Sequence, residues 1–182
     1  MSDASVFDDL PGDLMIWVLI VSELLVFGAG LAAFLAVRAS DPAGFGAAQD
    51  ALYRTGAGVN TVVLVTSGAL AAWALRLRED AQRGPARLAL VAAALLGVVF
   101  LLIKGFDYAG KAAAGITWDT HPFFTFYYLL TGFHAAHVVA GVLVLLLVAW
   151  KDTPRNIEAG AAFWHMVDLV WVILFPVLYL LR

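Results

Sequence analysis

Five long runs of apolar residues divide the chain, with short polar segments between them. The runs cover roughly residues 14–37, 56–75, 87–108, 123–150 and 160–181. Most of them are close to the ~20 residues that a helix needs to cross a bilayer core at about 1.5 Å per residue. None of the polar segments is long enough to form a soluble domain. The pattern predicts an all-α protein, a single bundle of five transmembrane helices.

The overall composition supports this interpretation. Of the 182 residues, 63% are hydrophobic and 14% are charged, and the mean hydropathy is +0.89. Soluble domains are only about 45–50% apolar and ~25% charged. The net charge of −3 gives no indication of nucleic-acid binding. The chain has no cysteine, which excludes disulfides, thiolate metal sites and covalently attached c-type haem.

The charged residues outside the apolar runs predict the orientation. Residues 1–13 contain four aspartates and no basic residue. A cleavable signal peptide needs a positively charged start, so we expect the first run to be a retained helix. The N-terminal side carries six Lys and Arg residues and the other side five, and the dense cluster from Arg76 to Arg87 lies on the N-terminal side. Because cytoplasmic loops are rich in Lys and Arg, we expect a cytoplasmic N-terminus and a C-terminus outside.

Five ionisable residues lie inside the apolar runs. Glu23 is in the first run, His134 and His137 are in the fourth, and His165 and Asp168 are in the fifth. A spacing of three residues places both members of each pair on one helix face. Ionisable groups at this depth cost several kcal/mol unless they are paired. We therefore expect Glu23, His137, His165 and Asp168 to form one buried, hydrogen-bonded cluster that joins three helices.

Three roles are open for these residues: a structural polar network, a protonatable relay, and a metal or haem site. Carboxylate-bound metal centres in helix bundles use Glu-x-x-His motifs and more carboxylates than this chain offers. His134 and His137 share one helix face and therefore cannot bind one iron from opposite sides. We expect no metal ligand and no catalytic residue. Glu23 is the best candidate for proton exchange, or for a neutral hydrogen-bond donor.

Other polar residues in the runs are expected to serve packing. Asn60, Thr66 and Ser67 lie in the second run, where such side chains bond across helices or back to their own carbonyls. Lys104 and Asp107 stand at the outer end of the third run, and we expect them to snorkel toward water. No phosphate loop, nucleophile elbow or HExxH motif is present.

Four stretches resemble subunit III of the haem–copper oxidases. IVSELLVF (residues 20–27) resembles that family's SE-x-x-x-F signature, and NTVVLVTSGALAAW (60–73) its next helix. TGFHAAHVVAG (131–141) is similar to its GFH-x-x-H-x-x-x-G helix, and EAGAAFWHMVDLVW (158–171) to its EAG and WH-x-VD-x-VW helix. The four matches stand in the family's order at compatible spacings. Full-length members have seven helices, of which this chain has room for the last five.

The resemblance implies a function and a setting. Five-helix members include subunit III of quinol oxidases and the NorE-type proteins associated with nitric oxide reductase, and the N-terminal LPGDLMIW looks most like the NorE-type branch. The resemblance implies that the chain is a multi-pass subunit of the bacterial inner membrane with a periplasmic C-terminus. The subunit binds no redox cofactor and packs beside a catalytic subunit that carries the haem and metals. It supports integrity, assembly or proton delivery in an oxidase of respiration or a reductase of denitrification.

The resemblance also assigns residues. The family's intramembrane carboxylate, paired histidines and WH-x-VD pair correspond to Glu23, to His134 and His137, and to His165 and Asp168. Family members hold phospholipid in a cleft, but one wall of that cleft is formed by the two helices that this chain lacks. The alternative function is a small proton-coupled transporter or channel that uses Glu23 and Asp168, although no inverted repeat is visible. A membrane metalloenzyme is the third candidate.

Overall fold

A computed structural model describes residues 14–151 and 153–181. The acidic segment of residues 1–13 and the terminal Arg182 lie outside the described residues, so the expectations that rest on them stay predictions.

The described chain consists of helices joined by short connections, and no strand occurs in these two ranges. Five helices, the last continued by a π-helical turn, are long and apolar enough to cross a membrane, as judged by length and composition. This result confirms the predicted all-α class with five long apolar spans. The elements are α1 (Leu14–Ser40), α2 (Pro42–Asp50), α3 (Arg54–Glu79), α4 (Arg83–Ala113), α5 (Pro122–Lys151), α6 (Pro154–Phe175) and η1 (Pro176–Leu180).

Two elements were not predicted from the pattern. The polar segment after the first run contains the short helix α2, in which the Asp41 side chain accepts a hydrogen bond of 2.9 Å from the Gly44 backbone N–H. An Asp cap followed by Pro42 is a typical helix start. At the other end, the last span changes from α-helix to π-helix at Pro176, a residue without a backbone N–H.

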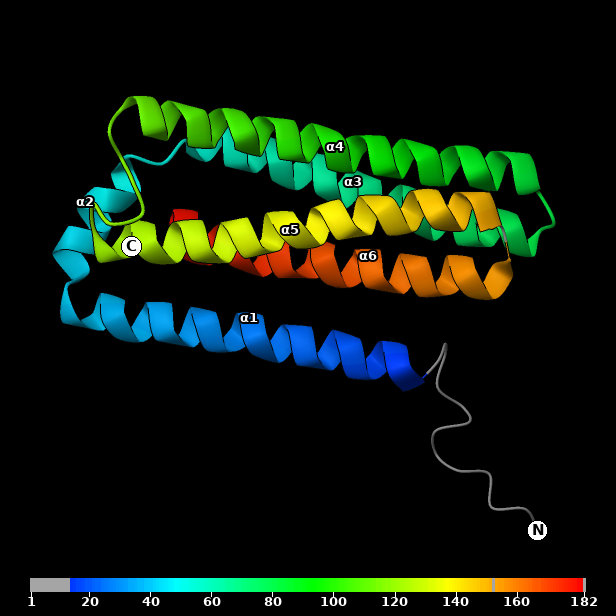
Figure 1. Ribbon diagram of the computed structural model, residues 1–182, viewed down its shortest axis with the longest axis horizontal. Coiled ribbons are helices and arrows are strands. Elements are labelled where there is room, and N and C mark those ends of the chain that lie inside the picture. Colours follow the sequence, from blue (N-terminus) through cyan, green and yellow to red (C-terminus); the bar gives the residue numbers. More distant parts are fainter. Residues whose placement is uncertain (1–13, 152, 182) are drawn as a thin grey trace, which may run out of the picture.

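Helices α3, α4, α5 and α6 form a closed ring, because α3 and α5 each pack against both α4 and α6 (Figure 1). Trp164 of α6 fills the middle of this ring. Its indole lies against Gly97 of α4 and Gly141 of α5, where added Cβ atoms would come within 2.7 Å and 2.5 Å of the ring. The two glycines therefore leave the space that the indole occupies.

Helix α1 lies outside the ring, along α5 and α6 (Figure 1). Only Phe27 and Phe34 of its 27 residues are buried. Phe27 contacts Phe133 of α5 at a centroid distance of 5.1 Å, and Phe34 contacts Phe123 at 6.0 Å. Phe27 and Phe34 thus anchor α1, whose first turns line a groove on each side.

Candidate functional site

Glu23 and His137 form a pair between α1 and α5. Glu23 Oε2 lies 3.0 Å from His137 Nε2, although the ring N–H is not aligned on it and this oxygen has no hydrogen bond. On the other side of the ring, Nδ1 lies 2.9 Å from the Phe133 carbonyl oxygen. A carbonyl only accepts, so Nδ1 carries a hydrogen. The imidazole therefore contacts both a carbonyl of its own helix and the Glu23 carboxyl group of α1.

His134 is separate from this pair. Its side chain is fully buried, and both ring nitrogens lack a hydrogen-bond partner. The imidazole stacks on Trp171 of α6 at a centroid distance of 5.2 Å and meets the edge of Phe100 of α4 at 5.5 Å. It therefore contributes to the aromatic core and makes no polar contact with the described residues.

His165 and Asp168 lie on a third face, between α6 and α3. A Cβ atom at Gly68 of α3 would come within 2.5 Å of Asp168 Oδ2 and 3.5 Å of His165 Nδ1, so both side chains reach α3 at this glycine. Asp168 Oδ1 is buried without a hydrogen-bond partner. Among the described residues, Glu23 contacts His137, and neither of these two is hydrogen-bonded to His165 or Asp168. The residues predicted as one cluster are thus divided over separate helix interfaces.

The polar residues of α3 face different surroundings. Asn60 Nδ2 donates to the Phe100 carbonyl at 3.2 Å, and Ser67 Oγ donates to the Ala93 carbonyl at 2.7 Å, so both bond to α4. Ser67 Oγ also accepts a hydrogen bond of 3.0 Å from Trp164 Nε1 of α6. Thr66 is exposed and bonds back within its own helix.

The expectation that Lys104 snorkels to water was wrong. Its side chain is buried, with 3% of the residue exposed, and its ammonium donates three hydrogen bonds. The acceptors are Asp107 Oδ2 at 3.2 Å, Tyr127 Oη of α5 at 2.7 Å and Tyr179 Oη of η1 at 2.8 Å. Lys111 forms an ion pair with the other oxygen of Asp107. We call these five residues the Lys104 network.

The aromatic surroundings explain why this lysine stays inside. Its ammonium lies 4.5 Å from the ring centroid of Tyr127 and 5.0 Å from that of Tyr108. Aromatic faces and three acceptors replace the water that a snorkelling lysine would seek. The spacing of Lys104, Asp107 and Lys111 on one helix face was a usable signal for the ion pairs. Nothing in the spacing indicated the two tyrosines, which come from distant segments.

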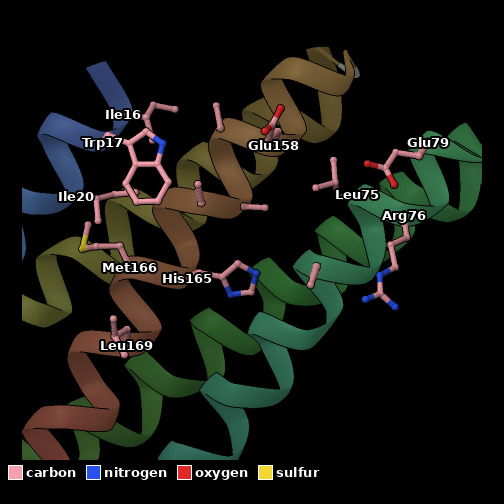
Figure 2. Close-up of a pocket in the computed structure, with 14 residues that line it drawn as sticks. Ile16, Trp17, Ile20, Leu75, Arg76, Glu79, Glu158, His165, Met166 and Leu169 are labelled. Carbon is pink, nitrogen blue, oxygen red and sulfur yellow. The ribbon is translucent and has the colours of Figure 1, made fainter. Parts of the chain in front are cut away.

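A groove opens between α1, α3 and α6, with a volume of about 580 Å³. Figure 2 shows His165 pointing from α6 into this space, with Trp17 and Ile20 of α1 on one side. Arg76 and Glu79 of α3 line it on the other side (Figure 2). We call it the α1–α3–α6 groove; its lining also includes Ile16, Ala72, Leu75, Glu158, Ala159, Ala161, Ala162, Met166 and Leu169.

No metal centre is visible in the described part of the chain, since no three His, Asp or Glu residues there come together closely enough to hold an ion. The fold and these sites define a multi-pass helical membrane protein with ionisable side chains at its helix interfaces.

Comparison with known proteins identifies the family. Residues 12–182 match the family model described as cytochrome c oxidase subunit III. The chain belongs to this family, as its four motifs predicted. The cytochrome c oxidase subunit 3 of Thermostichus vulcanus is 32% identical over 176 residues, which are 90% of this chain and 84% of that protein. The corresponding protein of Corynebacterium diphtheriae is 28% identical over 176 residues, 91% and 86% of the two chains.

Some relatives are much longer. The cytochrome c oxidase subunit 3 of Pyricularia grisea is 33% identical over 129 residues, which are 66% of this chain but only 47% of that protein. The matched part is thus about half of that relative, while it is most of the two bacterial ones.

Proposed function

We propose that this chain is a non-catalytic accessory subunit of a respiratory haem–copper oxidase or nitric oxide reductase complex. The observation that carries the proposal is the match of residues 12–182, which include all five candidate spans, to cytochrome c oxidase subunit III. In this proposal the chain binds no redox cofactor and is not an enzyme by itself. The haem and metals lie on a catalytic partner in the same bacterial inner membrane.

The proposed contribution is integrity, assembly or proton delivery for the catalytic subunit. The Glu23–His137 contact supports proton exchange, because it places a carboxyl group against an imidazole between two candidate spans. We also propose the NorE-type branch, with the N-terminus in the cytoplasm and the C-terminus in the periplasm. The motif LPGDLMIW and the basic cluster from Arg76 to Arg87 support these two points. Phospholipid in the apolar groove between α1, α5 and α6 is part of the same proposal.

Affinity purification in mild detergent tests this function, with mass spectrometry of the bound proteins and a visible absorption spectrum of the eluate. We expect haem absorbance together with a large catalytic subunit rich in histidine ligands. A colourless chain, alone or self-associated, contradicts the accessory role. Proton flux into liposomes that contain the purified chain would then support the transporter alternative, and metal bound to that chain would support the metalloenzyme.

A further inference from the structure

The α1–α3–α6 groove exposes ionisable side chains where hydrocarbon would otherwise cover the helices. His165 is an exposed residue that lines the groove. It lies eleven residues beyond Pro154, which is about 16 Å along the helix and close to the middle of a ~30 Å bilayer core. An imidazole that faces lipid at this depth is costly, so its surroundings in the membrane need to be polar.

The described residues do not supply these surroundings. His165 makes no hydrogen bond to another described side chain, whereas Asp168 lies against Gly68 of α3 and does not line the groove. The titratable groups that face the groove are Arg76 and Glu79 from α3 and Glu158 from α6, and the α1 side is lined by Ile16, Trp17 and Ile20. The end of the groove formed by these three residues therefore carries two carboxylates and one guanidinium.

Small residues on α3 and α6 leave room for the backbone of another helix to approach the groove. Gly68 and Ala72 stand four residues apart on α3, and Ala159 and Ala162 stand three apart on α6. Three of these four line the groove itself, and the fourth, Gly68, lies directly against Asp168. Small residues on two neighbouring faces are typical of surfaces where another transmembrane helix packs closely.

The outward faces of α4 and α5 are different. Their exposed large side chains include Leu95, Leu102, Leu143 and Leu146, which suit direct contact with acyl chains. These faces can lie directly against hydrocarbon, whereas the groove with His165 needs hydrogen-bonding atoms at bilayer depth.

We propose that the α1–α3–α6 groove is the docking surface for a transmembrane helix of a partner membrane subunit. That helix presents hydrogen-bonding side chains at the depth of His165. It carries a basic residue near Glu79 and Glu158, which opposes the net negative charge at that end of the groove. This inference rests on the proposed function, because it assumes that the chain works within a complex, and it names the surface used.

Photocrosslinking in native membranes tests the surface in the full complex. The photoreactive amino acid p-benzoylphenylalanine replaces Leu75 or Leu169, which line the groove, and Leu102 or Leu143, which lie outside it, in four separate variants. We expect several-fold more adduct with another membrane protein from the two groove positions than from the two control positions.

The polar contacts are tested in the Leu75 crosslinking variant. His165→Leu removes the imidazole and is expected to reduce the protein adduct several-fold, while His165→Asn keeps hydrogen-bonding atoms and retains most of it. Thr66→Val is the matched control, because Thr66 is an exposed polar residue of α3 that bonds to its own helix and does not line the groove. Size-exclusion chromatography of each variant in detergent identifies any that fails to fold.

The outcomes separate the two proposals. A haem-bearing complex whose protein adducts come only from Leu102 or Leu143 overturns the docking surface and leaves the accessory role intact. Groove adducts with lipid alone, or with a second copy of this chain, also overturn the docking surface. A chain that yields no protein adduct at any position and purifies without haem overturns both proposals.

Discussion

At the scale of single residues, a charged side chain can stay buried in this protein only where it has hydrogen-bonding or ion-pair partners. Lys104 and Asp107 lie in the third apolar run, where Lys104 is buried, Asp107 is partly buried, and both bond to neighbouring side chains. Asp107 in turn depends on two lysines, so the removal of one member leaves the others with uncompensated charge or unpaired hydroxyl groups. The network ties α4 to α5 and to the last turn of the chain.

Replacement of Lys104 should therefore destabilise the fold. For Lys104→Met we expect a loss of about 3 kcal/mol in the free energy of unfolding, as is typical when one partner of a buried ion pair is removed. Unfolding in detergent, followed by circular dichroism, measures it. Lys151→Met is the matched control, because Lys151 is exposed at the end of α5, and should change stability by less than ~0.5 kcal/mol. Equal stabilities of the two variants would contradict the structural role of the network.

Packing around Trp164 predicts a second effect at the residue scale. Gly141→Ala places a methyl group 2.5 Å from the indole, which has no room to move inside the ring of four helices. We expect a loss of roughly 1–3 kcal/mol from overpacking. Gly28→Ala is the control, since nothing lies within 4 Å of its new methyl group, and it should be neutral or slightly stabilising. Reversal of this order in thermal unfolding would rule out the close packing described.

At the scale of elements, the helices differ in how firmly they are held. The four-helix ring buries residues from every member, including Leu64, Leu90, Leu145 and Trp164. Helix α1 is attached by Phe27, Phe34, the Glu23–His137 contact and a hydrogen bond from Arg38 to the Leu181 carbonyl. Its first turns line grooves on both sides. An element with few buried contacts opens locally at a lower free-energy cost than the core.

Hydrogen exchange should reveal this difference. In detergent, we expect backbone amides of α1, above all those before Glu23, to exchange faster than those in the middle of α6, because α1 opens without disturbing the ring. Mass spectrometry of peptides from the two helices measures the rates. Protection of α1 equal to that of α6 would show that α1 is held more firmly than its few buried residues indicate. Slower exchange of α1 within the intact complex would agree with coverage by a partner.

At the scale of the whole molecule, the arrangement of spans predicts which loops face the cytoplasm. Five spans place the α3–α4 connection on the same side as the start of α1, and the α4–α5 connection on the opposite side. Because the basic cluster from Arg76 to Arg87 surrounds the first connection, we expect that connection in the cytoplasm.

The chain has no cysteine, so single cysteines can report this orientation without background. We expect a membrane-impermeant maleimide to label Ala114→Cys in intact cells, and to label Gln82→Cys only after the cells are opened. Both positions are exposed ends of connections. Labelling of Gln82→Cys alone in intact cells would reverse the proposed orientation.

The hydropathy pattern determined the architecture by itself, because a chain in lipid must satisfy its backbone hydrogen bonds within each span and only helices of sufficient length do so here. The motifs around Glu23, His134 and His165 likewise predicted the family, since they are local in sequence. The helix α2 was missed because its cap lies in a polar segment with no apolar period.

Only the tertiary structure decided which polar groups meet. Glu23 pairs with His137 and not with Asp168, and Lys104 bonds to Tyr179, which lies 75 residues away in the chain. These contacts depend on how each helix is rotated and tilted against its neighbours. Lipid is nearly as apolar as the helix interfaces, so a span that is hydrophobic on all sides carries little information in its hydropathy about which face turns inward.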